Sequence, residues 1–273
     1  MASAAEPQRR PLDPSELGTK EYWDAVYDRE LRNHENDADD EGNVWFSESN
    51  AEDAVVRQLN KLEEAGLLHR DGASGGDSQL NNGTETATHC ARSQPSRFLD
   101  LGTGNGHMLF QLREEDDDGN VWSGEMIGVD YSDASVQLAR GIATQKYGND
   151  IELSASLRFY CWDLLASPPG DWLGVGFDVV LDKGTFDAIS LMDHEGASRH
   201  PCETYLHKVT PLLKPGGFLF ITSCNWTKGE LLDWLAPEDG ELAFCDEAKY
   251  PTFTFGGRTG QSIVTVVLQR RRK

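Results

Sequence analysis

Four aspartates and one glycine-rich turn are the residues whose types and spacing point to chemistry. Asp100, Asp130, Asp163 and Asp182 each lie in or directly after an apolar run, and the turn GTGNG (102–106) comes just after the first of them. Glycine lets a backbone pass where a side chain would block it, so main-chain groups in such a turn can approach a bound molecule. Carboxylates beside the turn accept hydrogen bonds from hydroxyl and amino groups. The pattern predicts a binding site for a nucleoside-like ligand.

The spacing within the turn separates two classes of ligand. Gly102, Gly104 and Gly106 follow G-x-G-x-G, whereas dinucleotide-binding turns follow G-x-G-x-x-G and set a helix N-terminus against a pyrophosphate. His107 occupies the place of the last glycine in the dinucleotide pattern, and Asp100 stands two residues before the first glycine. A carboxylate there favours a ligand with an amine or ammonium group. A nicotinamide-dependent dehydrogenase is therefore disfavoured.

Two further aspartates are assigned to parts of an adenosine. An acidic residue that closes the second strand of such a fold accepts both ribose hydroxyls, which is the role expected for Asp130. Asp163 follows the third strand-like run and is placed to meet an adenine amino group. The predicted cofactor-binding residues also include neighbours of these groups, namely Thr103, Tyr131 and Leu164.

Alternating strand-like and helix-like runs must position these residues. Short apolar runs that favour strands lie at 97–101, 125–131, 157–162, 177–182, 217–224 and 262–268. Runs that favour helices lie at 107–113, 133–147, 201–213 and 228–235. Strands separated by helices predict a parallel sheet covered on both faces, with ligands at the carboxyl ends of the strands. The stretch 241–268 lacks a helix and predicts a closing hairpin, so the expected fold is a Rossmann-like α/β domain.

Composition divides the chain into four parts. Residues 1–18 are rich in Pro, Ala and charge and are predicted to be a disordered tail. Residues 19–70 hold two helical patterns and predict an N-terminal helical lid, because the segment is too short for a core of its own. Residues 71–96, rich in Gly, Ser, Thr and Asn, predict a flexible insertion. Residues 97–273 are the expected ligand-binding core.

The net charge of −21 over 273 residues restricts the partners. Nucleic-acid binding needs Lys and Arg to neutralise phosphates, so a direct nucleic-acid partner is not expected. An acidic surface fits a basic protein partner, because complementary fields speed encounter. The alternative is that the acidity only keeps the chain soluble.

Cysteine usage and hydropathy restrict the compartment. The five cysteines are widely spaced and form no C-x-x-C pair, which disfavours a disulfide framework and a structural zinc site. No apolar run approaches the roughly 18 residues of a membrane-spanning helix, and the N-terminal stretch has no apolar centre of a secretory signal. A cytoplasmic protein without a metal or membrane association is expected.

These residues carry a resemblance to a known family. The motif DLGTGNG (100–106), together with Asp130 and Asp163, resembles the class I S-adenosylmethionine-dependent methyltransferases. Three further segments resemble the elongation factor 1-alpha lysine methyltransferase family, the yeast Efm-four type and its animal relatives. They are YWDAVYDREL (22–31), GNVWF (42–46) and LDKGTFDAISL (181–191). The glycine motif is shared by many activities, whereas the last two segments are more specific.

The resemblance implies both a fold and a reaction. The fold is a seven-stranded sheet with a terminal hairpin, and the protein is expected to be a monomer. The reaction is methyl transfer from S-adenosylmethionine to a lysine ε-amine of elongation factor 1-alpha. Methyltransferases that act on nucleobase amino groups or glutamine amides tend to carry an NPPY-like tetrad after the fourth strand. This chain has DKGT (182–185) there, which disfavours such substrates.

A mechanism follows from the resemblance and from simple chemistry. A free lysine has a pKa near 10.4 and must be neutral to attack, which an apolar, aromatic channel favours by desolvation. No strong dedicated base is then required. We expect Asp182 to orient the amine and to border the cofactor, Phe186 to shape the channel, and Trp45 with Phe46 to close over the cofactor. Lys183 is expected to be an exposed loop residue.

Two other functions stay open at this point. A small-molecule methyltransferase of the same fold would need a closed pocket in place of an acidic open rim. A non-catalytic module would hold S-adenosylmethionine only as a structural or regulatory ligand.

Overall fold

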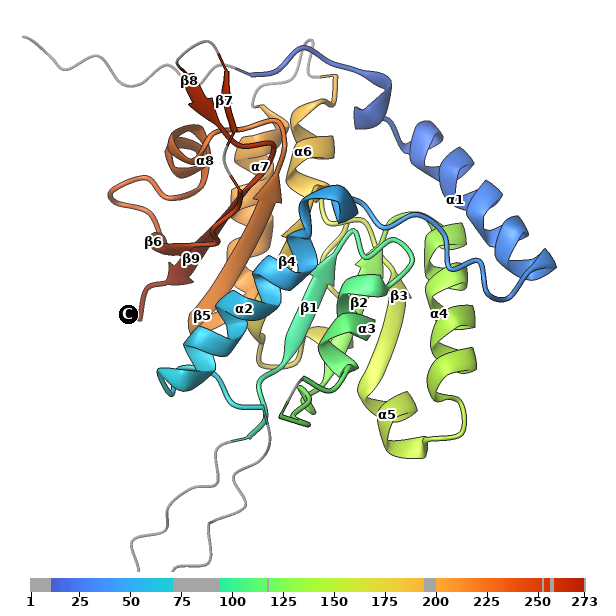
Figure 1. Cartoon of the computed structure of the whole chain (residues 1–273). Helices are drawn as coiled ribbons and strands as arrows, with labels where there is room; N and C mark the ends of the chain where they lie inside the picture. The colour runs from blue at the N-terminus through green and yellow to red at the C-terminus, as the bar shows by residue number, and fades with distance from the viewer. Residues whose placement is uncertain are drawn as a thin grey trace, which may run out of the picture.

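The computed structural model describes residues 11–70, 94–116, 118–193, 200–251, 253–255 and 258–272. Its centre is a seven-stranded sheet with the strand order β3-β2-β1-β4-β5-β9-β6 (Figure 1). The strands are β1 Phe98–Leu101, β2 Met126–Asp130, β3 Leu157–Cys161, β4 Phe177–Lys183, β5 Leu213–Ser223, β6 Leu242–Glu247 and β9 Val264–Arg270. Strands β1 to β5 are parallel, and β9 is antiparallel to both β5 and β6. The Rossmann-like sheet and its closing antiparallel pair are therefore confirmed.

Three of the eight described helices, at His107–Arg113, Asp133–Tyr147 and Lys228–Leu235, coincide with their predicted ranges. The eight are α1 Lys20–Asn36, α2 Ala51–Glu64, α3 His107–Arg113, α4 Asp133–Tyr147, α5 Ile151–Ser156, α6 Thr185–Ser190, α7 Pro201–Val209 and α8 Lys228–Leu235. Short 3-10 turns occupy Glu16–Gly18, Ser47–Ser49, Asp171–Leu173 and Thr210–Leu212. Strands β7 Phe253–Phe255 and β8 Arg258–Gly260 form a separate two-stranded sheet.

Three differences from the sequence-based expectation have local causes. Helix α7 ends at Val209 and continues as a 3-10 turn because Pro211 lacks the N–H that the next helical turn needs. Helix α2 ends at Glu64, before the Gly66 that has a φ of 69°. Helices α5 and α6 were not predicted, since each has only six residues, too few to show a helical period.

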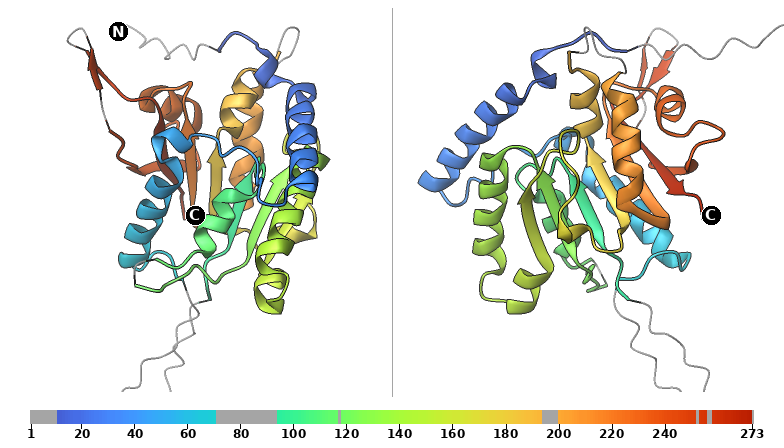
Figure 2. Two further views of the ribbon diagram at one scale, coloured as in Figure 1. Left: turned by 45° about the vertical axis from the view of Figure 1, so that its right-hand side comes forward. Right: turned by 180° about the vertical axis from the view of Figure 1, so that it is seen from behind.

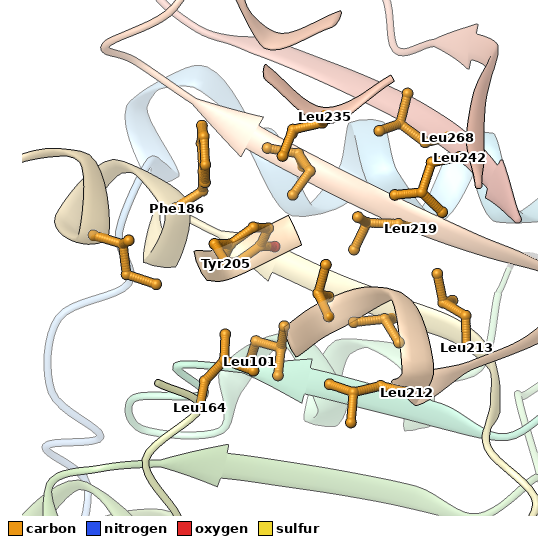
Figure 3. Close-up of a cluster of buried hydrophobic side chains, with 14 of the residues drawn as sticks. Leu101, Leu164, Phe186, Tyr205, Leu212, Leu213, Leu219, Leu235, Leu242 and Leu268 are labelled. Carbon is orange, nitrogen blue, oxygen red and sulfur yellow. The ribbon is translucent and has the colours of Figure 1, made fainter. Parts of the chain in front are cut away.

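The two faces of the sheet carry different helices. Helices α2, α3 and α4 cover one face, with α1 beside α4, and α6, α7 and α8 cover the other, as the views in Figure 1 and Figure 2 agree. Each face has its own buried apolar cluster, one around Leu59, Leu109 and Leu138 and the other around Leu219 and Tyr205. Figure 3 shows the second cluster.

Alternation along the strands decides which cluster each side chain joins. Successive residues of a strand point to opposite faces of the sheet. In β4, Val180 belongs to the cluster with Tyr205, whereas the next residue, Leu181, belongs to the cluster of α2 and α3. The same alternation places Asp182 on the α7 face and Lys183 on the α2 face.

The N-terminal segment contributes to two parts of the molecule. Helix α2 packs on the sheet through Val55, Leu59 and Leu62 and so belongs to a layer of the core. Helix α1 packs beside α4, where Tyr27 joins the same cluster. The apolar run NVWF (43–46) predicts a short extended piece, but the chain turns at 45–46 and continues as the 3-10 turn Ser47–Ser49. Within the described ranges, no helix is long and apolar enough to cross a bilayer.

Parts of the predicted domain division lie outside the described residues. These are residues 1–10 of the expected tail and residues 71–93 of the expected insertion.

Candidate functional site

A cavity of about 270 Å³ opens at the carboxyl ends of β1, β2 and β4. Its lining comes from the β1–α3 turn, the ends of β2 and β4, the segment after β3, the first half of α1 and the turn around Trp45. In open parallel sheets, ligands bind at this edge, where the chain reverses its order between neighbouring strands. Strand β1 lies between β2 and β4, so the cavity straddles that reversal.

The structure brings most of the predicted site residues to this cavity. Nine of them line it, namely Trp45, Phe46, Gly102, Thr103, Gly104, Asp130, Tyr131, Asp163 and Leu164. Four do not, namely Asp100, Gly106, Asp182 and Phe186.

The glycine turn is shaped by contacts with the protein itself. Gly102 and Gly104 have φ values of 63° and 58°, in the left-handed region that favours glycine. A Cβ on Gly102 would collide with the hydroxyl of Thr185, and one on Gly104 would lie 2.5 Å from the hydroxyl of Tyr27. Helices α6 and α1 therefore press against the turn from outside and leave its backbone to line the cavity.

Asp130 is held rigidly at the end of β2. Its Oδ2 accepts a hydrogen bond of 3.1 Å from the N–H of Gly104, and its Oδ1 accepts one of 2.9 Å from the N–H of Ser132. Burial raises the pKa of this carboxyl, which the two backbone donors counteract. The carboxylate thus ties the glycine turn to the end of β2 and still borders the cavity.

Asp163 holds the loop after β3. Its Oδ1 accepts hydrogen bonds of 2.8 and 3.0 Å from the N–H groups of Leu165 and Ala166. Trp162, beside it, lines the cavity as well, and its indole N–H donates to the carbonyl of Pro168 at 2.9 Å. The loop after β3 thus places a carboxylate and an aromatic side chain side by side at the cavity.

Asp100 lies behind the glycine turn. Its side chain is buried, and its Oδ2 accepts a 2.7 Å hydrogen bond from the hydroxyl of Thr103. Burial raises the pKa of Asp100 to about 7. Asp100 therefore binds the glycine turn through Thr103 and does not itself line the cavity. Gly106, with a φ of 84°, begins α3 and packs against Phe110 and Phe159.

The expected catalytic roles of Asp182 and Phe186 do not fit the structure. The carboxylate of Asp182 is 2% exposed and accepts hydrogen bonds from the N–H of Phe186 and the hydroxyl of Tyr205. Phe186 is fully buried and packs on Tyr205 and Trp226 (Figure 3). Alternation along β4 directs Asp182 into the core under α7, away from the cavity. Phe186, on α6, enters the same core through its contact with Tyr205.

Two other residues of the segment LDKGTFDAISL (181–191), Lys183 and Asp187, line the cavity in place of Asp182. Asp187 lines the cavity and accepts hydrogen bonds of 2.5 Å from the hydroxyl of Ser223 and 2.9 Å from the N–H of Cys224. Burial raises the pKa of Asp187. Lys183 also lines the cavity, and its side chain is only 16% exposed, so the expectation of an exposed loop lysine was wrong. Both residues lie at the junction between β4 and α6. Because α6 was not predicted from the sequence, the direction of their side chains could not be predicted either.

Aromatic residues from the N-terminal segment form one wall. Trp23, Tyr27 and Trp45 line the cavity and pack on one another, with ring centroids 5.1 to 6.3 Å apart for the contacts of Trp23. Lys20, at the start of α1, donates to the carbonyl of Tyr131 at 3.0 Å and joins this wall to the end of β2. The predicted lid residue Trp45 therefore borders the cavity.

The charged lining carries both signs, with one more carboxylate than ammonium group among the described residues. Among the described lining residues, the carboxylates are Asp130, Asp163 and Asp187, and the ammonium groups are Lys20 and Lys183. A cavity with this balance and an apolar, aromatic wall favours an amphipathic ligand that carries positive charge.

Comparisons with known proteins agree with this architecture. A methyltransferase-domain family profile matches residues 93–271. The protein-lysine N-methyltransferase efm4 of Schizosaccharomyces pombe is 36% identical over 258 residues, which cover 94% of this chain and 95% of that protein. The EEF1A lysine methyltransferase 2 of Homo sapiens is 32% identical over 262 residues, covering 94% of this chain and 88% of that protein.

A solved structure shares the fold across the whole length. It is the magnesium protoporphyrin IX methyltransferase of Synechocystis PCC 6803 with bound S-adenosylmethionine, with a TM-score of 0.52 and 14% identity. The match covers 94% of this chain and 98% of that one, and it bears on the fold alone. On the strength of the sequence relatives, the chain belongs to the methyltransferase-domain family and, within it, to the protein-lysine methyltransferases that include efm4 and EEF1A lysine methyltransferase 2.

Proposed function

We propose that this protein transfers the methyl group of S-adenosylmethionine to a lysine ε-amine of translation elongation factor 1-alpha. Similarity to enzymes named for this activity extends over 94% of the chain and so includes the N-terminal wall as well as the sheet. The observation that carries the proposal is the position of Asp130. Its carboxylate closes β2 and borders the cavity beside the glycine turn, which suits the ribose of an adenosyl cofactor.

The residues present fit the whole cofactor. Asp130 would accept the ribose hydroxyls, and Asp163 with Leu164 would meet the adenine. The backbone of Gly102 and Gly104 would lie along the amino-acid part, since both residues line the cavity between the ends of β2 and β4. The cofactor supplies a methyl group that its sulfonium already activates, so the protein chiefly has to align the nucleophile with it.

Asp187 takes the role that was expected for Asp182. It is the lining carboxylate at the β5 side of the cavity, fixed there by Ser223 and Cys224. We place the incoming lysine amine beside it, with Leu191 and Met192 as apolar neighbours. The apolar surroundings favour the neutral amine by desolvation, and the carboxylate orients its remaining N–H groups.

Charge and cysteine chemistry support the expected partner and compartment. A net charge of −21 suits a basic protein substrate and disfavours nucleic acid. Cys161, Cys202, Cys224 and Cys245 are free thiols, which is usual for a reducing compartment such as the cytoplasm. We propose that the protein acts there as a monomer.

A transfer assay tests the proposal directly. Purified protein is incubated with S-adenosylmethionine labelled on its methyl group and with recombinant elongation factor 1-alpha. We expect label on a lysine of the factor, and none with Asp130→Ala. Label in small molecules of a cell extract, with none on the factor, would favour the small-molecule enzyme. Binding of the cofactor without transfer to any acceptor would favour the non-catalytic module.

A further inference from the structure

A buried cation stands at one end of the cavity. Lys183 is the last residue of β4, and its Nζ donates to the carbonyl of Trp45 at 3.1 Å. The same Nζ lies 3.5 Å from Oε1 of Glu52, the second residue of α2. These contacts hold an ammonium group at the cavity wall.

Glu52 is shared between two cationic partners. Its Oε2 lies 2.6 Å from Nδ1 of His107, and its Oε1 has no hydrogen-bond partner, so only the longer ion pair with Lys183 reaches it. The hydrogen bond to Glu52 raises the pKa of His107. When His107 is protonated, one carboxylate faces two positive charges, and the cluster of Lys183, Glu52 and His107 has a surplus positive charge.

The strand order places this cluster on the β4 side of the cavity, across the glycine turn from Asp130, the residue proposed to bind the ribose. Strand β1 lies between β2 and β4, so its glycine turn separates Asp130 at the end of β2 from Lys183 at the end of β4. His107 directly follows the turn, and Thr185, two residues after Lys183, presses against Gly102. A ligand with its ribose at Asp130 and its chain along the turn therefore reaches Lys183.

The other lining cation, Lys20, lies beside the end of β2, on the side of the cavity where Asp130 stands. Nζ of Lys20 contacts both carboxylate oxygens of Asp24 at 2.9 Å and the carbonyl of Tyr131 at 3.0 Å. An adenosyl amino acid carries a carboxylate that must find a positive partner, because an unpaired charge in a partly buried site is costly. Of the two ammonium groups among the described lining residues, Lys183 is the one on the amino-acid side.

We propose that Lys183 binds the α-carboxylate of the amino-acid part of the cofactor. The carbonyl of Trp45 is the positioning group that holds the ammonium in place, whereas Glu52 is a carboxylate that competes with the ligand for it. The assignment rests on the proposed function, since it takes S-adenosylmethionine as the ligand. The turn around Trp45 then contributes in two ways: its backbone carbonyl accepts a hydrogen bond from Lys183, and its indole ring forms part of the aromatic wall.

Two adenosyl ligands distinguish a contact between Lys183 and the carboxylate from a general disturbance of the binding site by the substitution. S-Adenosylhomocysteine has the amino-acid part, whereas 5′-methylthioadenosine shares the adenosine and the sulfur but lacks it. Titration calorimetry of Lys183→Met should show an affinity for S-adenosylhomocysteine about 10- to 100-fold weaker, the loss typical of one charge-assisted hydrogen bond. The affinity for 5′-methylthioadenosine should stay as in the wild type, which also shows that the variant is folded.

Two more variants sharpen the result. Lys214→Met is the matched control, because Lys214 pairs with Asp178 at 2.7 Å at the opposite edge of the sheet, and neither affinity should change. Glu52→Gln keeps the shape of the side chain and removes the charge that competes for Lys183. It should bind S-adenosylhomocysteine at least as tightly as the wild type.

The outcomes distinguish the assignment from the proposed function. Equal loss of both ligands in Lys183→Met, or loss of neither, would overturn the carboxylate role while wild-type binding leaves the proposed function intact. A loss for Glu52→Gln as large as that for Lys183→Met would also overturn it. A wild-type protein that binds neither ligand would remove the proposed function itself.

Discussion

The hydroxyl of Tyr205 on α7 donates a 2.7 Å hydrogen bond to Oδ2 of Asp182 at the end of β4. Both oxygens of the same carboxylate accept from the N–H of Phe186 at 3.1 Å, so one buried group joins β4, α6 and α7. Asp182 thus holds core elements together by hydrogen bonds. It does not line the cavity, although it lies at the carboxyl end of β4 next to Lys183, which does.

The titration of Asp182 should appear in the pH dependence of stability. Burial raises the pKa of Asp182 from 3.8 to about 7 in the folded protein. The folded state therefore binds this proton more tightly, and the stabilisation is complete below the unfolded pKa and lost as pH rises through about 7. Asp182→Asn cannot titrate, so urea unfolding should favour the variant more at about pH 8 than at about pH 5. Parallel curves for the two proteins would show that Asp182 is ionised throughout this range.

Gly104 and Tyr27 should be energetically coupled. Gly104→Ala forces a side chain into the left-handed region and against the hydroxyl of Tyr27, 2.5 Å away. We expect a loss of about 1–3 kcal/mol in the free energy of unfolding, and weaker binding of S-adenosylhomocysteine. Adding Tyr27→Phe removes the clashing oxygen and should recover part of both losses. Simple additivity in this double-mutant cycle would mean that backbone strain alone causes the effect.

Asp130 should act on the part of the ligand that Lys183 does not touch. Asp130→Asn keeps an acceptor for the N–H of Gly104 but loses the charge that faces the ribose. We expect weaker binding of both S-adenosylhomocysteine and 5′-methylthioadenosine, by about 10-fold or more, since both carry the ribose. An unfolding curve close to that of the wild type is the control. Selective loss of S-adenosylhomocysteine would place Asp130 at the amino-acid part instead.

Asp187 and Asp182 should differ in their effect on turnover. Asp187→Asn leaves the cofactor pocket in place but weakens the group that orients the amine, so kcat should fall by about 10-fold or more while cofactor affinity is kept. Asp182→Asn should leave kcat near that of the wild type. Initial rates with saturating S-adenosylmethionine and elongation factor 1-alpha compare the two variants. The reverse order would restore the catalytic role first expected for Asp182.

The sequence alone predicts the fold and the cavity-lining residues at the ends of β1, β2 and β3. Apolar runs of strand length, separated by helical patterns, specify a parallel sheet, and such a sheet gathers the carboxyl ends of its strands at one edge. The glycine turn, Asp130 and Asp163 each lie at or just after the end of a strand. Their place at one edge of the sheet therefore follows from the order of strands and helices along the chain. The same holds for Thr103, Tyr131 and Leu164, which line the cavity as expected.

Tertiary packing decided the other end of the site. Alternation along β4 shows that Asp182 and Lys183 point to opposite faces, but only the docking of α7 and α2 decides which face is core and which is cavity. Asp187 enters the cavity because the chain turns into α6 at Gly184, whose φ is 96°. Glu52 and Trp45 meet Lys183 from distant parts of the sequence. Contacts of this kind leave no pattern in a single sequence, because they depend on how separate elements pack rather than on the period of any one of them.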